Sequence, residues 1–193
     1  MVKVVFIRHG QTEWNVSGRY QGQSDVALSA TGIEQAEKLA RHFPLAAIDA
    51  VYSSDLLRAR VTAEKVAGRF GLRVQTDAAF RELNFGDWEG LTYEQIVASW
   101  ADAMKNFLRH PDILQVPHGE SFPEVQQRAL NRLRELLVQH EGETIVIVAH
   151  GAVLRTLLAD ALHMPLRCLW SIRQFNTAVN IVRYDAEDRK SVV

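Results

Sequence analysis

The sequence contains a single cysteine, Cys168, among its 193 residues. One cysteine cannot form a disulfide within the chain, and it cannot supply a metal site built from several thiolates. A chain that needs no disulfide suits a reducing compartment, so we expect a cytoplasmic protein.

The chain also lacks an excess of charge of either sign. Its 22 basic and 23 acidic side chains give a formal net charge of -1. Such a balance provides no overall attraction to nucleic acid or to an anionic membrane, so neither is an expected partner. Affinity for an anionic ligand would have to come from a local cluster of cations.

No hydrophobic run is long enough to span a membrane. The run at residues 2–7 is also too short for the hydrophobic core of a signal peptide, but it has the length and β-branched content of a buried strand. There is no internal repeat and no linker-like stretch, so we expect one domain over residues 1–193.

Apolar periodicity predicts strands that alternate with helices. Strands are expected at residues 2–7, 47–52, 73–75, 145–148 and 178–184. Helices are expected at residues 29–43, 56–70, 122–137 and 154–162. Residues 8–28 are expected to form a loop, and residues 80–120 an irregular segment with weak helical stretches at 93–97 and 101–108. The alternation predicts an α/β fold of three layers, α/β/α, with a mostly parallel sheet.

Ionisable residues follow two of the predicted strands directly. Arg8, His9 and Gly10 follow the strand at residues 2–7, and His150 and Gly151 lie just beyond the strand at 145–148. Ligands of such sheets bind at the carboxyl ends of the strands, and a glycine lets a ligand approach the main chain closely. One histidine at a strand end is often only a rim residue that bonds a carbonyl, but two histidine–glycine pairs favour a shared site.

Arg58 lies in the first turn of a predicted helix that Ser53, Ser54 and Asp55 are expected to cap. A cation at this position opposes the helix macrodipole, and a bound anion would resolve the conflict. The alternatives are that Arg58 points to solvent or pairs with Asp55. Glu82, in the loop after the strand at residues 73–75, would be an ordinary surface acid if it stood alone.

These residues form part of a series of motifs that resembles the histidine phosphatase superfamily, the group that contains the cofactor-dependent phosphoglycerate mutases. The motifs are Arg8-His9-Gly10-Gln11-Thr12-Glu13-Trp14-Asn15, Tyr20-Gln21-Gly22, Ser53-Ser54-Asp55-Leu56-Leu57-Arg58-Ala59, Arg81-Glu82-Leu83-Asn84-Phe85-Gly86-Asp87-Trp88-Glu89-Gly90, Gly119-Glu120-Ser121 and Ala149-His150-Gly151. They occur in the expected order between residue 4 and about residue 180. Gln11 and Ala27 stand where glutamate and proline are common, but neither position holds a catalytic atom.

The resemblance implies a phosphoglycerate mutase-like fold and a reaction in which His9 takes a phosphoryl group. A neutral imidazole suits this role because it does not repel a phosphate dianion, and its other ring nitrogen should be held by a carbonyl, for which the backbone near Gly10 is the expected partner. The residues implied to bind phosphate or substrate are Arg8, Asn15, Gln21, Gly22, Arg58, Glu82, His150 and Gly151.

The implied chemistry gives each ionisable group a role. Arg8 and Arg58 would clamp the phosphoryl oxygens, and His150, if protonated, would add a third cation. Glu82, kept protonated by burial beside Phe85 and Trp88, would protonate the leaving group and then activate water. No metal or other cofactor is expected, because the arginines supply the charge and would repel a metal ion.

The residues after Glu82 favour a phosphatase over a mutase. Leu83-Asn84-Phe85-Gly86 follows the acid, as in phosphatases of the superfamily, whereas its mutases tend to be longer and carry an arginine-histidine-tyrosine-glycine stretch there. We therefore expect hydrolysis of a phosphate monoester of a small metabolite that the sequence does not identify. A mutase and a non-catalytic phosphate-binding domain are the alternatives, and the sequence leaves a homo-oligomer open.

Overall fold

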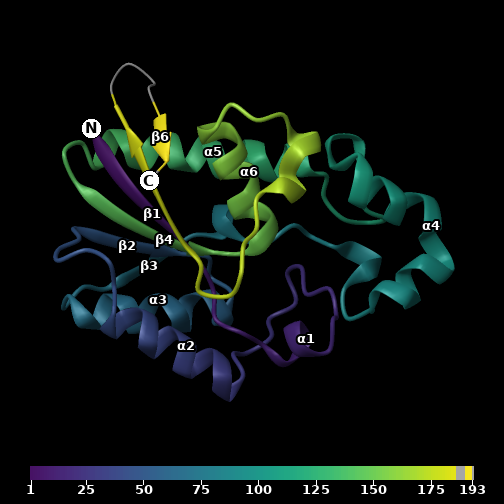
Figure 1. Ribbon diagram of the computed structural model, residues 1–193, viewed down its shortest axis with the longest axis horizontal. Coiled ribbons are helices and arrows are strands. Elements are labelled where there is room, and N and C mark those ends of the chain that lie inside the picture. Colours follow the sequence, from purple (N-terminus) through teal and green to yellow (C-terminus); the bar gives the residue numbers. More distant parts are fainter. Residues whose placement is uncertain (186–189, 193) are drawn as a thin grey trace.

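A six-stranded sheet runs through the protein, whose computed structural model describes residues 1–185 and 190–192 (Figure 1). The strands are β1 (Val2–Arg8), β2 (Ala50–Ser53), β3 (Val74–Thr76), β4 (Thr144–Ala149), β5 (Val179–Tyr184) and β6 (Lys190–Val192). Their order in space is β3-β2-β4-β1-β5-β6. The first four of these are parallel, β5 is antiparallel to β1, and β6 is antiparallel to β5. The mostly parallel sheet predicted from the sequence is confirmed.

Helices cover both faces of the sheet and complete the predicted α/β/α arrangement (Figure 1). One layer contains α2 (Ala30–Arg41) and α3 (Leu57–Arg69), and the other contains α5 (Phe122–Gln139) and α6 (Gly151–Ala161). Two further helices, α1 (Glu13–Val16) and α4 (Tyr93–Arg109), lie away from the sheet. The assignment of the whole chain to one domain stays a prediction.

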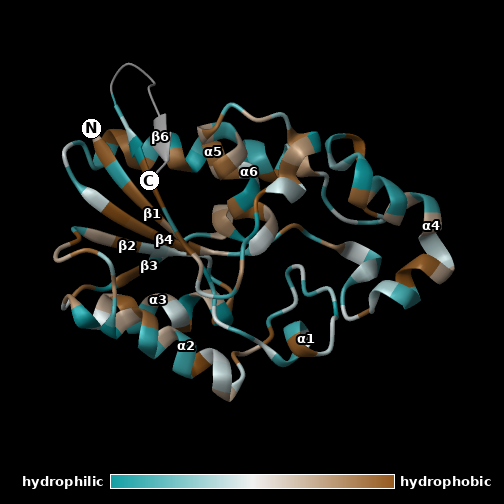
Figure 2. Ribbon diagram, in the orientation of Figure 1, coloured by the Kyte–Doolittle hydropathy of each residue, from teal (hydrophilic) through white to brown (hydrophobic). Residues whose placement is uncertain are grey.

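Both faces of the sheet are apolar because each is covered by helices. In β1, Val5 and Ile7 pack in the core beneath α2 and α3, whereas Val4 and Phe6 pack in the core beneath α5 and α6. All four side chains are buried, and burial of such a side chain stabilises the fold by about 1.5–3 kcal/mol. Figure 2 shows the same pattern, with largely brown central strands and helices that carry both colours.

The structure differs from the sequence predictions mainly in two segments, and it also adds β6, which was not predicted. Residues 8–28 are not entirely loop, because Thr12 caps the four-residue helix α1. Such a short helix has no apolar periodicity to reveal it. The segment at residues 80–120 is more regular than expected, since α4 joins the two weak helical stretches, with a break at Trp100 (φ -139°, ψ 49°).

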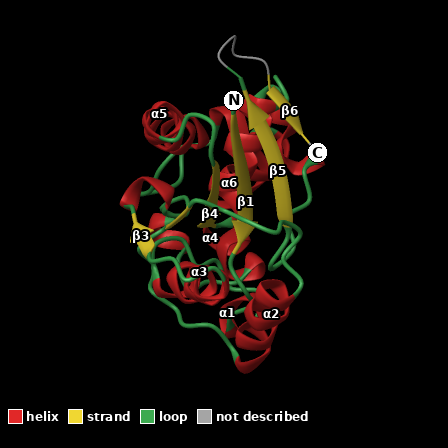
Figure 3. Cartoon of the chain, turned by 90° about the vertical axis from the view of Figure 1, so that its left-hand side faces the viewer, coloured by secondary structure: helices red, strands yellow, loops and turns green. Residues whose placement is uncertain are grey.

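The sheet places the ends of three strands side by side. Register pairs Arg8 of β1 with Ala149 of β4, and Ser53 of β2 with Val148 of β4. The residues that follow these strands therefore emerge at one edge. In Figure 3, β1 runs from the N-terminus at the top toward this edge, near α1 and α2.

Candidate active site

His9 and His150 come together at the ends of β1 and β4. The backbone N–H of His9 donates to the carbonyl oxygen of Ala149 at 3.0 Å, so the two strand ends are directly joined. The imidazole ring centroids lie 5.1 Å apart, and both side chains are buried. The structure thus brings together the two histidine–glycine pairs found in the sequence.

A hydrogen bond fixes the tautomer of His9. Its Nδ1 lies 2.7 Å from the carbonyl oxygen of Gly10, the partner expected from the sequence. Because a carbonyl only accepts, Nδ1 carries the proton and Nε2 holds a free electron pair. Burial, followed by the charges of Arg58 and Arg8, holds the pKa of His9 well below its usual range. The free protein therefore keeps this imidazole neutral at neutral pH.

Arg58 is almost fully buried, with 1% of its surface exposed. Its Nη1 donates to the carbonyl oxygen of Ser24 at 2.8 Å and its Nη2 to that of Gly22 at 2.7 Å. Burial lowers the pKa of Arg58 to about 10, which still leaves it charged at neutral pH. The alternative in which Arg58 points to solvent is therefore wrong.

The capping expected for α3 is also wrong. Leu56 occupies the N-cap position and has no side-chain acceptor, and Ser54 Oγ accepts only from the N–H of Leu56 itself, at 3.3 Å. Asp55 instead pairs with Arg81 at 2.5 Å, and Arg58 bonds Ser24 and Gly22, so the alternative in which Arg58 pairs with Asp55 is wrong as well. The N–H of Leu57 donates to Oδ1 of Asp25 at 2.7 Å, so a distant loop supplies the acceptor.

Several buried polar atoms around His9 have no hydrogen-bond partner within the described part of the chain. They are Nε of Arg8, Nε of Arg58, both ring nitrogens of His150 and Oε1 of Gln21. Buried polar atoms are nearly always bonded in folded proteins, so such a cluster indicates a site completed by a ligand. Four of the five atoms are nitrogens of cationic or potentially cationic groups, which suits an anion.

A cavity of about 120 Å³ opens beside His9. It is lined by Arg8, His9, Asn15, Arg19, Gln21, Gly22, Arg58, Glu82 and Phe85. Seven of these nine were expected at the site, and Arg19 is the cationic side chain that the sequence patterns did not reveal. Its position directly before the Tyr20-Gln21-Gly22 motif was the available signal.

His150 and Gly151 were also expected at the site, but they do not line this cavity. His150 packs against the ring of His9, and its pKa is held well below the usual range by burial, then by Arg58, His9 and Arg8. The free protein therefore holds His150 neutral. A Cβ atom at Gly151 would lie 3.7 Å from Oε2 of Glu82, so this residue borders the acid.

Glu82 is bound by backbone N–H groups that the sequence did not reveal. Its Oε1 accepts from the backbone N–H groups of Leu83 (2.9 Å), Ala152 (3.0 Å) and Val153 (3.2 Å), and its Oε2 accepts from Ala152 at 3.0 Å. The carboxyl group thus lies at the N-terminus of α6, where backbone N–H groups hold it in place beside the cavity.

Asn15 and the loop at Gly22 are held by Asn176 and Glu89, and only Glu89 belongs to a motif found in the sequence. Oδ1 of Asn15 accepts from Nδ2 of Asn176 at 3.2 Å, which leaves the Asn15 amide nitrogen free to donate. The carboxylate of Glu89 accepts from the backbone N–H of Gln23 at 2.7 Å and of Ser24 at 2.8 Å. Glu89 thereby fixes the carbonyls that bind Arg58.

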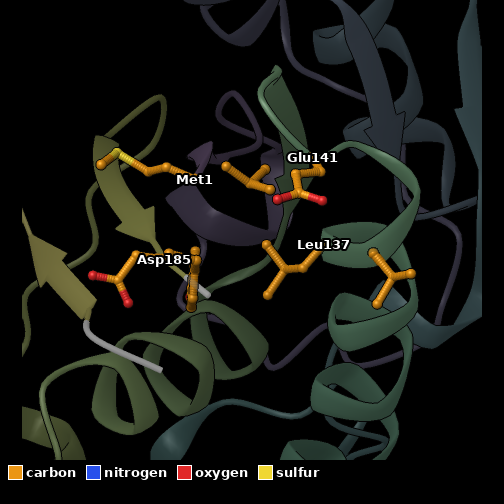
Figure 4. Close-up of a pocket in the computed structure, with 7 residues that line it drawn as sticks. Met1, Leu137, Glu141 and Asp185 are labelled. Carbon is orange, nitrogen blue, oxygen red and sulfur yellow. The ribbon is translucent and has the colours of Figure 1, made fainter. Parts of the chain in front are cut away.

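A second hollow, of about 270 Å³, lies at the opposite end of β1. Met1, Leu137, Glu141 and Asp185 contribute to its wall (Figure 4). Two of these side chains are carboxylates, which would repel a phosphate.

Within residues 1–185 and 190–192, there is no group of three or more His, Cys, Asp or Glu side chains placed to hold a metal ion. None of the described helices is long and apolar enough to cross a membrane.

The family model of the histidine phosphatase superfamily (branch 1) matches residues 4–193. The chain belongs to this superfamily. It is 31% identical over 193 residues to phosphoserine phosphatase 1 of Hydrogenobacter thermophilus, covering 100% of this chain and 90% of that protein. It is 36% identical over 193 residues to phosphoglycerate mutase-like protein 4 of Arabidopsis thaliana, covering 98% of this chain and 83% of that protein.

Solved structures of this superfamily superpose closely. YhfR of Bacillus stearothermophilus matches with a TM-score of 0.94 and 36% identity, covering 100% of this chain and 95% of that one. A phosphoserine phosphatase of Entamoeba histolytica in complex with phosphoserine matches with a TM-score of 0.88 and 32% identity, with the same coverage. The comparisons support the phosphatase interpretation over the mutase alternative.

Proposed function

We propose that this protein hydrolyses phosphate monoesters of small metabolites through a phosphohistidine formed on His9. The observation that carries the proposal is the 2.7 Å hydrogen bond between Nδ1 of His9 and Gly10. It leaves Nε2 unprotonated beside a cavity that Arg8 and Arg58 make cationic. A neutral nucleophile next to two cations suits attack on a phosphate dianion.

In the first step, Nε2 of His9 attacks the phosphorus atom and the bond to the ester oxygen breaks. Arg8 and Arg58 bind the phosphoryl oxygens, whose charge spreads in the transition state. Glu82 gives its proton to the departing alkoxide, so an alcohol leaves. The proposal requires Glu82 to be protonated when it faces the substrate dianion, since two adjacent negative charges repel.

In the second step, the Glu82 carboxylate takes a proton from a water molecule that attacks the phosphorus atom. The bond between phosphorus and Nε2 breaks, which releases inorganic phosphate and restores protonated Glu82 and neutral His9. His150 is neutral in the free protein, so it becomes the expected third cation only when the bound phosphate dianion stabilises its protonated form.

The proposal requires no metal ion, because the two arginines supply the positive charge that a metal would otherwise provide. A cation placed between them would be repelled. The proposal also includes a cytoplasmic location, since the one cysteine forms no disulfide within the chain. Neither nucleic acid nor a membrane is a proposed partner.

We further propose that the preferred substrates carry a second anionic group beside the phosphate. Arg19 lines the cavity in addition to Arg8 and Arg58, so one cation is available beyond those that bind the phosphoryl group. Phosphoserine, which is named for two of the relatives, has a carboxylate that such a side chain would bind. Phosphoethanolamine lacks only this carboxylate and is a matched comparison, and Arg19→Gln should remove any preference between the two.

Trapping of the phosphoenzyme tests the nucleophile. The parent protein is mixed with radiolabelled p-nitrophenyl phosphate and quenched in alkali, where a phosphohistidine survives. We expect label on the parent and on His42→Ala, an exposed control, but none on His9→Ala. Turnover by His9→Ala at the parent rate would contradict the proposal. Rapid conversion of 3-phosphoglycerate to 2-phosphoglycerate with a bisphosphate primer, and little free phosphate, would instead establish the mutase.

A further inference from the structure

We propose that Arg128 of α5 is a positioning residue that holds Glu82 in place for proton transfer. The inference rests on the proposed function, in which Glu82 is the proton donor. Arg128 lies outside the cavity lining, so it acts through other residues.

All five N–H donors of Arg128 are used, and three bind consecutive parts of the loop that carries Glu82. Nη1 donates to the carbonyl oxygens of Ala79 at 2.8 Å and Arg81 at 2.9 Å. Nη2 donates to the carbonyl oxygen of Glu82 itself at 2.9 Å. A planar guanidinium thereby fixes the direction of the main chain on both sides of the Glu82 Cα atom.

Glu120 orients the guanidinium from the opposite side. Its Oε1 accepts from Nε of Arg128 at 2.8 Å and its Oε2 from Nη2 at 3.0 Å, which is a bidentate pair. Oε2 also accepts from the backbone N–H of Asn84 at 2.8 Å, two residues after the acid. The pair therefore binds four backbone groups of the Glu82 loop, which are three carbonyls bound by Arg128 and one N–H bound by Glu120.

These bonds suit a positioning role because the Glu82 carboxyl group has to lie in two contacts at once. It must reach the N–H groups of Ala152 and Val153 on α6 and also face the cavity beside His9. The rest of its loop is held by Arg128 and Glu120, not by α6. A displacement of about 1 Å in a reacting group can cost about 100-fold in rate. Lysine, with three donors on one nitrogen, cannot reproduce five bonds in a plane.

The experiment compares two substrates of similar shape whose leaving groups differ in their need for a proton. p-Nitrophenolate departs as a stable anion, whereas the more basic phenolate of phenyl phosphate needs protonation. The measured quantity is kcat/KM, which reports transfer to His9 and is not limited by later hydrolysis of the phosphohistidine. Glu82→Gln calibrates the effect, with a loss of roughly 100-fold or more on phenyl phosphate and a much smaller loss on p-nitrophenyl phosphate.

We expect Arg128→Lys to lose about 10- to 100-fold on phenyl phosphate and clearly less on p-nitrophenyl phosphate. Glu120→Gln should change the ratio of the two values in the same direction, and it carries the test if Arg128→Lys does not fold. Arg132→Lys is the matched control. Arg132 lies one turn further along α5, is similarly buried, and pairs with Asp77 without touching the Glu82 loop.

Equal losses on both substrates, or no loss, for Arg128→Lys and Glu120→Gln would overturn the positioning role. Such a result together with a changed ratio in Glu82→Gln would refute only this inference. An unchanged ratio in Glu82→Gln would refute the proposed proton donor, and with it the inference. A changed ratio in Arg132→Lys would show that any loosening of α5 suffices and would also overturn the role of Arg128.

Discussion

The imidazole rings of His9 and His150 lie with their centroids 5.1 Å apart in a buried site where both pKa values are held well below the usual range. Burial is the largest cause for each, and Arg58 is the second. Protonation of either ring would place another positive charge beside two arginines. The free protein therefore holds two neutral histidines in a cationic site, which a dianion would stabilise.

This pair predicts how stability depends on pH. Unfolded histidines titrate near pH 6.5, so below that value the unfolded chain binds protons that the folded protein does not. The stabilisation is complete above about pH 6.5 and is lost as the pH falls toward the folded pKa values, by up to about 1.4 kcal/mol per pH unit for each histidine. Urea unfolding from about pH 7.5 to about pH 5.5 measures this slope. His150→Gln should have a shallower slope, and an unchanged slope would contradict the buried, neutral state of His150.

Arg58→Lys should impair catalysis far more than it impairs folding. The variant keeps a positive charge but loses the fork that binds the carbonyls of Gly22 and Ser24 while facing the cavity. We expect kcat/KM for p-nitrophenyl phosphate to fall by about 100- to 1,000-fold and inhibition by vanadate to weaken. Arg60→Lys, on an exposed part of the same helix, should match the parent in both measurements. Parent-like inhibition by vanadate in Arg58→Lys would remove this arginine from the phosphate site.

Gly18 and Gly22 both have positive φ, but only Gly22 has no room for a Cβ atom, so alanine variants of the two can distinguish backbone strain from steric overlap. A Cβ atom at Gly22 (φ +53°) would lie 2.0 Å from Oε1 of Glu89, whereas one at Gly18 (φ +67°) would meet nothing within 4 Å. Gly18→Ala should cost about 1–2 kcal/mol in the free energy of unfolding, from the backbone alone. Gly22→Ala should cost a further 1–3 kcal/mol, approximately, from overpacking, and should also lower activity because the Gly22 carbonyl binds Arg58. Urea unfolding of both variants checks the difference, and equal costs would mean that Glu89 moves freely.

Asp25 should stabilise α3 although it is distant in sequence. Its Oδ1 accepts from the N–H of Leu57 in the first turn, next to Arg58. Asp25→Ala should lower the free energy of unfolding by about 1 kcal/mol, the usual value for a lost capping acceptor. Asp25→Asn keeps an acceptor and should lose less. If thermal unfolding showed the alanine variant to be as stable as the parent, the loop would not act as a cap.

The strands and most helices were predictable because their signals are local. Residues 2–7 read as a buried strand from their own side chains, and β1 has the same residues plus Arg8. The parallel arrangement followed from the alternation of strands and helices. The register that sets His9 beside His150 required the paired strands, since β1 and β4 are separated by most of the chain.

The environments of the site residues were less predictable. The sequence placed Glu82 beside nearby aromatic residues, but it did not reveal that the carboxyl group binds N–H groups 70 and 71 residues further along the chain. The sequence offered Ser53, Ser54 and Asp55 as caps for α3, whereas the acceptor for the Leu57 N–H in its first turn is Asp25. Short helices such as α1 and anchors such as Arg128 leave no periodic signal.

The sequence by itself determined which chemical groups are available and the order in which the strands and helices present them. The chain alone identifies the main site residues, because strand ends, helix starts and motifs are local features of a sequence. These residues are Arg8, His9, Arg58, Glu82 and His150. Only the tertiary structure decided the burial of Arg58 and the donors around Glu82. These properties depend on backbone groups far away in the chain, and packing of α3, α5 and α6 against one sheet is what brings those groups within hydrogen-bonding distance.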